Sequence, residues 1–214
     1  MHRFSQDGSS ITRGRAPAAV YAVLRMHPVE HRGLRELYAM SRQLRDHWRT
    51  LAARLDANAP AQAQLLREGS DLTRVLIGEL TDVTAARGLD GRPLAQGLGA
   101  RLAGIHNGLL DTALEVHQAL RFAALDVVHV VSLLEFLARA AAQDADPELE
   151  AFLAGWASRM RAQEEAIRAV AVALADDPDR AIERADPGVA GRIGHGAVSA
   201  IGTFGEWFDR RAKR

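Results

Sequence analysis

Inward-facing positions recur at steps of three and four along most of this chain, which is the spacing of a helix with one buried face. In the first clear stretch they are Leu34, Leu37, Ser41, Leu44, Trp48, Leu51 and Leu55. The period continues in a second stretch through Leu65, Leu72, Leu76, Leu80 and Val83. A third stretch repeats it at Leu149, Leu153, Trp156, Met160, Ile167, Val170 and Leu174. The pattern predicts three long amphipathic helices.

Prolines mark the ends of these stretches, at Pro17, Pro28, Pro60, Pro93, Pro147, Pro178 and Pro187. Proline lacks a backbone N–H and clashes with the preceding turn, so helices tolerate it in the first turn and not in the interior. An aspartate precedes the prolines at 147, 178 and 187, where its side chain can cap a helix. We therefore expect helices to begin at prolines and the second helix to end near Arg87-Gly88.

The interval between Pro93 and Pro147 carries glycines in its first third and yet keeps one apolar phase. The positions that share this register are Leu98, Leu102, Ile105, Leu109, Val116, Leu120, Ala123, Val127, Val130, Leu134 and Leu137. Because a loop normally resets the phase, the sequence predicts one helix of roughly 70 Å, kinked near Gly104 or Gly108. Residues 109–142 are apolar nearly all round, which indicates a helix surrounded by its neighbours at the centre of the fold.

The C-terminal segment, residues 188–210, combines an apolar stripe with a row of small residues. Glycine costs about 1 kcal/mol in a helix interior, so a helix with many glycines needs close packing as compensation. We expect it to cover the end of the long central helix, with a protein partner, a second copy or a membrane surface as alternatives. The residues expected to make this contact are Gly191, His195, Gly202, Gly205, Phe204, Trp207 and Phe208.

Together these elements predict an all-α fold, an antiparallel bundle of four long helices with a central apolar helix. A short helix from Pro17 to about His27 and the glycine-rich C-terminal helix complete it. Residues 1–15 are polar and without period, so we expect a flexible arm, followed by a single domain over residues 16–214.

Composition removes several classes of function. The chain has no cysteine, which excludes disulfides, thiolate metal sites and cysteine nucleophiles. Its formal net charge is zero, which argues against a dedicated nucleic-acid surface. No apolar run is long enough for a transmembrane helix, and the start lacks a small-residue cleavage site, so we expect a cytoplasmic protein. No phosphate-binding loop, dinucleotide fingerprint or nucleophile elbow is present.

One string that matches a metal-ligand pattern is His27-Pro28-Val29-Glu30-His31, the H-x-x-E-H order of inverted zinc peptidases. That chemistry requires both histidines on one helical face. Pro28 instead places His27 at or before a helix start. We interpret His27 as a capping residue followed by a solvated first turn.

A second candidate metal site lies on the predicted central helix. Asp126 and His129 put a carboxylate and an imidazole on one face of an apolar stretch, where buried polar groups are costly unless paired. Asp111 and Glu115 extend this stripe, and Glu79 and Glu164 are placed to meet it from other helices. Di-metal carboxylate bundles use such a layout. The alternative is an internal network in which Arg121 or another arginine neutralises Asp126.

The sequence therefore predicts a non-catalytic helical interaction or scaffold protein that associates with itself through the C-terminal helix and needs no cofactor. The alternative is a bundle that binds a divalent metal or a small ligand and has redox or hydrolytic activity. In that case the metal ligands are Asp126, His129, Glu79, Asp111 and Glu115.

Overall fold

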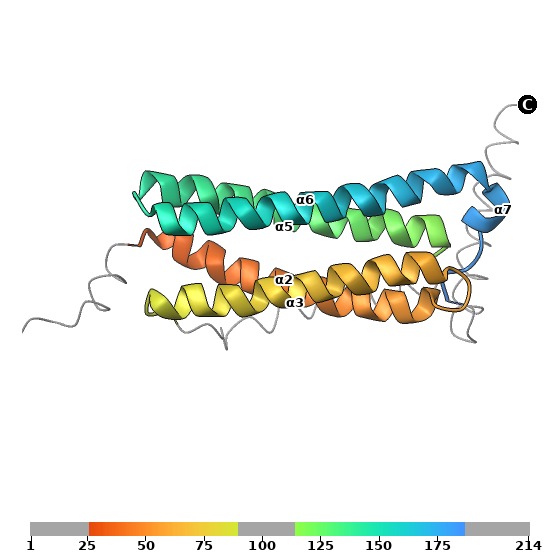
Figure 1. Ribbon diagram of the computed structural model, residues 1–214, viewed down its shortest axis with the longest axis horizontal. Helices are drawn as coiled ribbons and strands as arrows, with labels where there is room; N and C mark the ends of the chain where they lie inside the picture. The colour runs from red at the N-terminus through yellow and green to blue at the C-terminus, as the bar shows by residue number, and fades with distance from the viewer. Residues whose placement is uncertain (1–25, 90–113, 187–214) are drawn as a thin grey trace, which may run out of the picture.

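The computed structural model describes residues 26–89 and 114–186, and these are mostly helical (Figure 1). The four long helices are α2 (Pro28–Leu55), α3 (Pro60–Ala86), α5 (Val116–Gln143) and α6 (Pro147–Ala173). A 3-10 turn, η1 (Leu174–Asp176), and a short helix, α7 (Pro178–Ala181), follow. Over the described ranges there is no strand, and an isolated bridge joins Glu115 to Arg184. The predicted all-α class is confirmed.

Prolines open the helices, as the sequence predicts. Pro28, Pro60, Pro147 and Pro178 all stand in a first turn. Asp146 caps α6 by accepting a hydrogen bond from the Leu149 N–H at 3.0 Å. Asp177 accepts from the Arg180 N–H at 3.2 Å in the same way. The other three prolines lie outside the described residues.

The long helices form two hairpins that lie against each other (Figure 1). Residues 56–59 join α2 to α3, and residues 144–146 join α5 to α6. Across the hairpins α2 packs on α5 and α3 packs on α6, and helices that pack together run in opposite directions (Figure 1). The end of α3 and the start of α5 therefore lie at opposite ends of the assembly (Figure 1).

Most positions of the predicted stripes lie in the core. In α3, Leu76 and Leu80 are buried, whereas Leu65, Leu72 and Val83 are partly buried and pack against the core. Every position of the first stripe, from Leu34 to Leu55, is buried, including Ser41. The stripe of α6 is buried except for Val170, which is partly buried. Trp48 and Trp156 are almost wholly inaccessible. Burying each such large side chain contributes about 1.5–3 kcal/mol, so these stripes are the main source of stability.

Close approach of α2 and α3 depends on Gly69. A Cβ atom at this position would lie 2.1 Å from Cζ3 of Trp48 and 2.8 Å from Nε2 of Gln163. Gln163 in turn donates to the carbonyl of Leu65 at 3.2 Å, which joins α6 to α3. The absence of a side chain at residue 69 is thus what leaves room for the indole.

The predicted long helix after Pro93 is wrong at its junction with α5. Glu115 has an extended backbone (φ −79°, ψ 158°), and the helix begins at Val116. Here the Ala185 N–H donates to the Leu114 carbonyl at 3.0 Å and the Val116 N–H to the Glu183 carbonyl at 2.9 Å. The backbone pairs with a distant segment instead of a preceding helical turn. With 28 residues, α5 is as long as α2.

The prediction that this helix is surrounded is also wrong. One face of α5 packs on α2 and α6, whereas four large apolar side chains on the helix remain accessible. Phe122 is 49%, Leu125 61%, Val128 45% and Phe136 50% exposed. A helix that is apolar on two sides can pack against neighbours on both sides or on one side. Its composition alone does not distinguish these two arrangements.

Several predictions fall outside the described residues: the arm 1–15, residues 17–25 of the predicted first helix, the glycines from 97 to 108 and the C-terminal helix 188–210 with its contact residues. Met26 and His27, where the first helix was expected to end, are described and are not helical. Among the helices that are described, none is both long and apolar enough to cross a membrane.

Candidate functional site

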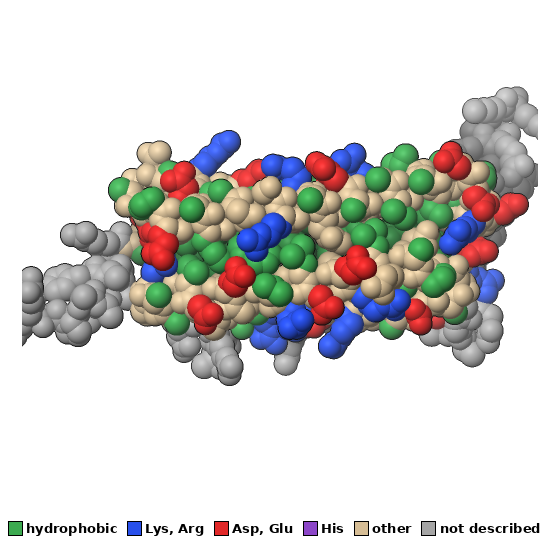
Figure 2. All heavy atoms as spheres, in the orientation of Figure 1, with side chains coloured by type: hydrophobic (Ala, Val, Ile, Leu, Met, Phe, Trp, Pro, Cys, Tyr) green, Lys and Arg blue, Asp and Glu red, His purple; other side chains and the backbone are tan. Residues whose placement is uncertain are grey.

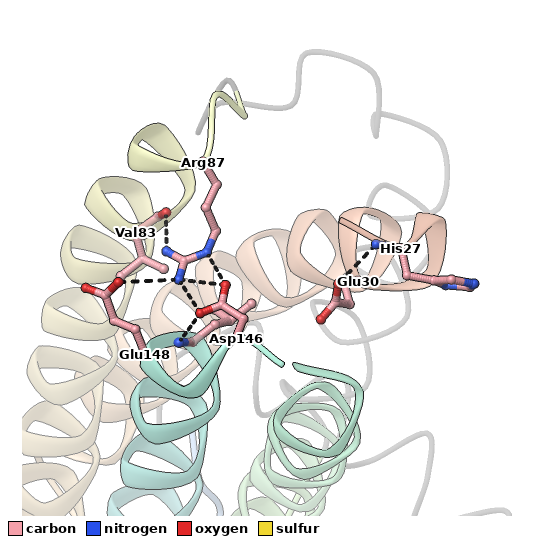
Figure 3. A network of polar contacts seen from close by, with 7 residues as sticks. His27, Glu30, Val83, Arg87, Asp146 and Glu148 are labelled. Carbon is pink, nitrogen blue, oxygen red and sulfur yellow. Dashed lines mark hydrogen bonds and ion pairs between the residues drawn. The ribbon is translucent and has the colours of Figure 1, made fainter. Parts of the chain in front are cut away.

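Charged residues gather at one end of the helices, where α2 begins, α3 ends and α5 turns into α6 (Figure 3). His27 is the N-cap of α2, and its Nδ1 accepts a hydrogen bond from the Val29 N–H at 3.1 Å. The His27 N–H donates to Oε2 of Glu30 at 3.1 Å and to Oδ2 of Asp144 at 3.0 Å. The prediction that His27 caps a helix is confirmed, and Glu30 completes a capping box.

The first turn of α2 is not solvated at Glu30, contrary to expectation. Glu30 is 2% exposed, and its Oε1 is buried without a hydrogen-bond donor. Burial, followed by the hydrogen bond to Asp144, raises the pKa of Glu30 to about 7. The hydrogen bond from Glu30 and that from the His27 backbone lower the pKa of Asp144. A carboxyl group with a pKa near 7 keeps its proton well above the usual range of a glutamate, and the protonated form of Glu30 can donate that proton to Asp144.

Arg87 holds the same end of the molecule together (Figure 3). Its Nε lies 3.0 Å from Oδ2 of Asp146 and its Nη2 lies 3.0 Å from Oδ1, a two-point contact. Nη1 donates to the Val83 carbonyl at 3.2 Å. Because Asp146 also caps α6, one guanidinium joins the end of α3 to the start of α6. This is a structural role.

Asp126 pairs with a residue that the sequence analysis did not single out. Its Oδ2 lies 2.6 Å from Nδ1 of His47 on α2. The His47 side chain is only 7% exposed, whereas that of Asp126 is 36% exposed. The predicted arginine partner, Arg121, is exposed. His47 sits beside the buried stripe of its helix, and no spacing pattern connects it to α5.

The other predicted metal ligands are dispersed. His129 is exposed on α5, and Glu79 accepts a hydrogen bond from Nε1 of Trp156 at 2.8 Å. Glu115 is the N-cap residue of α5, with Oε2 3.4 Å from Nδ1 of His117. Glu164 pairs with Arg168 in its own helix, and Asp111 lies outside the described residues. Within residues 26–89 and 114–186, no three such side chains are grouped to hold a metal ion.

The outer face of α5 is the most unusual surface that the structure describes. It consists of Phe122, Leu125, Val128, His129, Ser132 and Phe136. All six are exposed, and four of them are the large apolar side chains noted above. Elsewhere in the described residues the exposed large apolar side chains are Val29, Val75, Val172 and Ile182, on separate elements. Contiguous apolar patches on soluble proteins mark interaction sites.

The side of the molecule formed by α3 and α6 has a different character (Figure 2). Apolar atoms are visible along the junction of the two helices, with acidic and basic side chains on both sides of them (Figure 2). Two hydrogen bonds cross this junction, from Trp156 to Glu79 and from Gln163 to Leu65. The apolar atoms visible here therefore lie where α3 packs on α6, and these two hydrogen bonds join the helices at that place.

Comparison with models of known families, with curated proteins and with solved structures gives no significant match to this chain. The functional argument consequently rests on the geometry of the chain itself.

Proposed function

We propose that this chain is a non-catalytic interaction protein, an antiparallel four-helix bundle that associates with itself through an apolar helix face. The observation that carries the proposal is the outer face of α5, with Phe122, Leu125, Val128 and Phe136 each at least 45% exposed. From the sequence we expected self-association through the C-terminal helix. The exposed apolar residues lead us to propose the outer face of α5 as the contact surface instead.

The energetic argument concerns the cost of leaving this face in water. Covering a large apolar side chain that is half exposed contributes about 1 kcal/mol, so four of them supply a few kcal/mol per copy. That gain supports a reversible association and falls short of an obligate one.

The described polar residues support a structural reading. His27 and Asp146 cap helices, His47 and Asp126 join α2 to α5, and Arg87 joins α3 to α6. These contacts occupy the acid and histidine side chains at the helix junctions. The arrangement gives the metal-binding alternative no specific support.

Light scattering on the full chain, from about 1 µM to about 1 mM, tests the proposal. We expect the mass to rise with concentration in the wild type and to stay at that of one chain in Leu125→Glu. Val172→Glu is the matched control, because Val172 is an apolar residue of α6 that is 68% exposed. It should associate like the wild type.

A wild-type mass that stays at one chain over the whole range would contradict the proposal. A second variant, lacking residues 188–214, separates the two candidate surfaces. If that variant is monomeric while Leu125→Glu still associates, the contact lies on the C-terminal segment and the outer face of α5 is the wrong surface.

A further inference from the structure

The outer face of α5 has an internal symmetry about His129. Phe122 and Phe136 lie seven residues before and after it, and Leu125 and Leu133 lie four residues before and after it. At a rise of 1.5 Å per residue, these pairs stand about 10 Å and about 6 Å from His129 along the helix axis. Leu133 is partly buried, at the edge of the exposed face. Followed in either direction from His129, the helix presents leucine and then phenylalanine.

A helix with this symmetry matches itself when it is turned end to end. If two copies of α5 pair in opposite directions around a two-fold axis at His129, each Phe122 meets Phe136 of the second copy. Each Leu125 then lies level with Leu133 of the second copy. A two-fold interface needs a self-complementary surface, and this face fulfils that condition in two equivalent clusters of two phenylalanines and two leucines.

The helix dipoles favour antiparallel pairing. Two α5 helices that ran in the same direction would place like ends of their dipoles together, whereas opposite directions bring unlike ends together. Since α5 runs from Val116 to Gln143, an axis at His129 lies at its middle and aligns the ends of the two helices.

We infer that the partner of the outer face is a second copy of this chain, with the two α5 helices antiparallel across a two-fold axis at His129. This inference rests on the proposed function and specifies its geometry. The contact extends from Phe122 to Phe136, about 21 Å along one face of a single helix. The dimer is therefore weak and depends on concentration.

Cross-linking tests the geometry, because the chain contains no cysteine and a single introduced thiol reacts alone. His129→Cys places two thiols at the axis, where a short bismaleimide joins them. Gln143→Cys lies on the same side of α5, and the antiparallel arrangement separates its two copies by about 40 Å. Gly155→Cys is the control for cross-links that form by random collision, because it lies on an exposed part of α6 with open space around it.

We expect the dimer yield of His129→Cys to exceed that of both other variants at least fivefold. Adding Leu125→Glu should remove this excess, whereas adding Val172→Glu should not. Equal, high yields from residues 129 and 143 would mean parallel pairing and would overturn the inference. A wild-type dimer in light scattering without linkage at residue 129 would also overturn it but leave the proposed function standing. A wild type that stays monomeric would contradict both this inference and the proposed function.

Discussion

His47 and Asp126 join the two hairpins through a contact of 2.6 Å between Nδ1 and Oδ2, although 79 residues separate them in the chain. The imidazole is nearly inaccessible and the carboxylate is partly accessible. The pair lies on the junction of α2 with α5, beside the outer face of α5. It therefore fixes one hairpin on the other at the level of that surface.

Removal of this carboxylate should cost stability. Asp126→Ala takes the acceptor away from a nearly buried imidazole, and hydrogen bonds to charged groups contribute about 1.5–3 kcal/mol. We expect urea unfolding to show a loss in that range, with Asp126→Asn intermediate. His129→Ala, on the exposed side of the same helix, should change the unfolding free energy by less than about 0.5 kcal/mol in dilute protein.

Elemental analysis of the same variants tests the alternative interpretation. A wild type that purifies with a bound divalent metal, lost in both Asp126→Ala and His129→Ala, would contradict a purely structural role for this pair.

The raised pKa of Glu30 makes the stability of the fold depend on pH. The pKa of Glu30 rises from 4.5 to about 7 on folding. Between these values the folded chain holds a proton that the unfolded chain has released, so the unfolding free energy falls as pH rises through this window. A pKa difference of this size corresponds to a total loss of about 3 kcal/mol. Asp144, whose pKa is lowered, acts in the opposite sense, and its contribution is lost as pH falls below 3.8.

Glu30→Gln should flatten the pH profile. Glutamine still accepts from the His27 N–H and can donate to Asp144 without losing a proton. We expect the variant to be about 2–3 kcal/mol more stable than the wild type at pH 8 and nearly equal to it at pH 5, measured by urea unfolding. Glu36→Gln, at an exposed position of α2, is the control and should keep the wild-type profile. Parallel profiles for wild type and Glu30→Gln would refute the raised pKa of Glu30.

Two glycines of α3 should respond oppositely to alanine. At Gly69 the added methyl collides with the buried Trp48, so Gly69→Ala should lose about 1–3 kcal/mol despite the better helix propensity. At Gly78 nothing lies within 4 Å of the new methyl. Gly78→Ala should therefore gain about 0.5–1 kcal/mol. Thermal or urea unfolding of both variants decides the matter, and a gain at both positions would show that α2 and α3 do not approach as described.

Arg87 should not be replaceable by lysine. Lysine offers a single charged point where Asp146 is held by two parallel contacts. Arg87→Lys should lower the unfolding free energy by about 1–2 kcal/mol. The contact of Arg74 with Asp71 is 3.4 Å long and both side chains are largely exposed, so Arg74→Lys should have almost no effect. Similar losses in both variants would place the Arg87 contact among ordinary surface pairs.

Local rules predicted much of this fold. The starts of α2, α3 and α6 follow from Pro28, Pro60 and Pro147, since proline chemistry acts within one turn. The buried stripe from Leu34 to Leu55 follows from helical periodicity alone. His27 as a cap follows from its position before a proline.

The errors concern contacts between distant parts of the chain. Glu115 is extended because residues 114–116 pair with residues near Ala185, and an uninterrupted apolar phase conceals this. Glu30 is buried beside Asp144, the residue that follows α5, and these two positions are distant in the sequence. His47 meets Asp126 only once two hairpins have packed together. The sequence could not show which side of α5 is exposed, because both sides of the helix carry the same types of apolar residue.

The hairpin arrangement has a consequence for how the chain acquires its structure. Most tertiary contacts join helices that are neighbours in sequence, α2 with α3 and α5 with α6, and fewer join one hairpin to the other. Such local contacts form quickly because little loop entropy is lost. The hairpins are therefore expected to assemble first and to dock late. A chain severed between residues 89 and 114 should still be able to reassemble from its two halves, with the contact of His47 and Asp126 restored across the break.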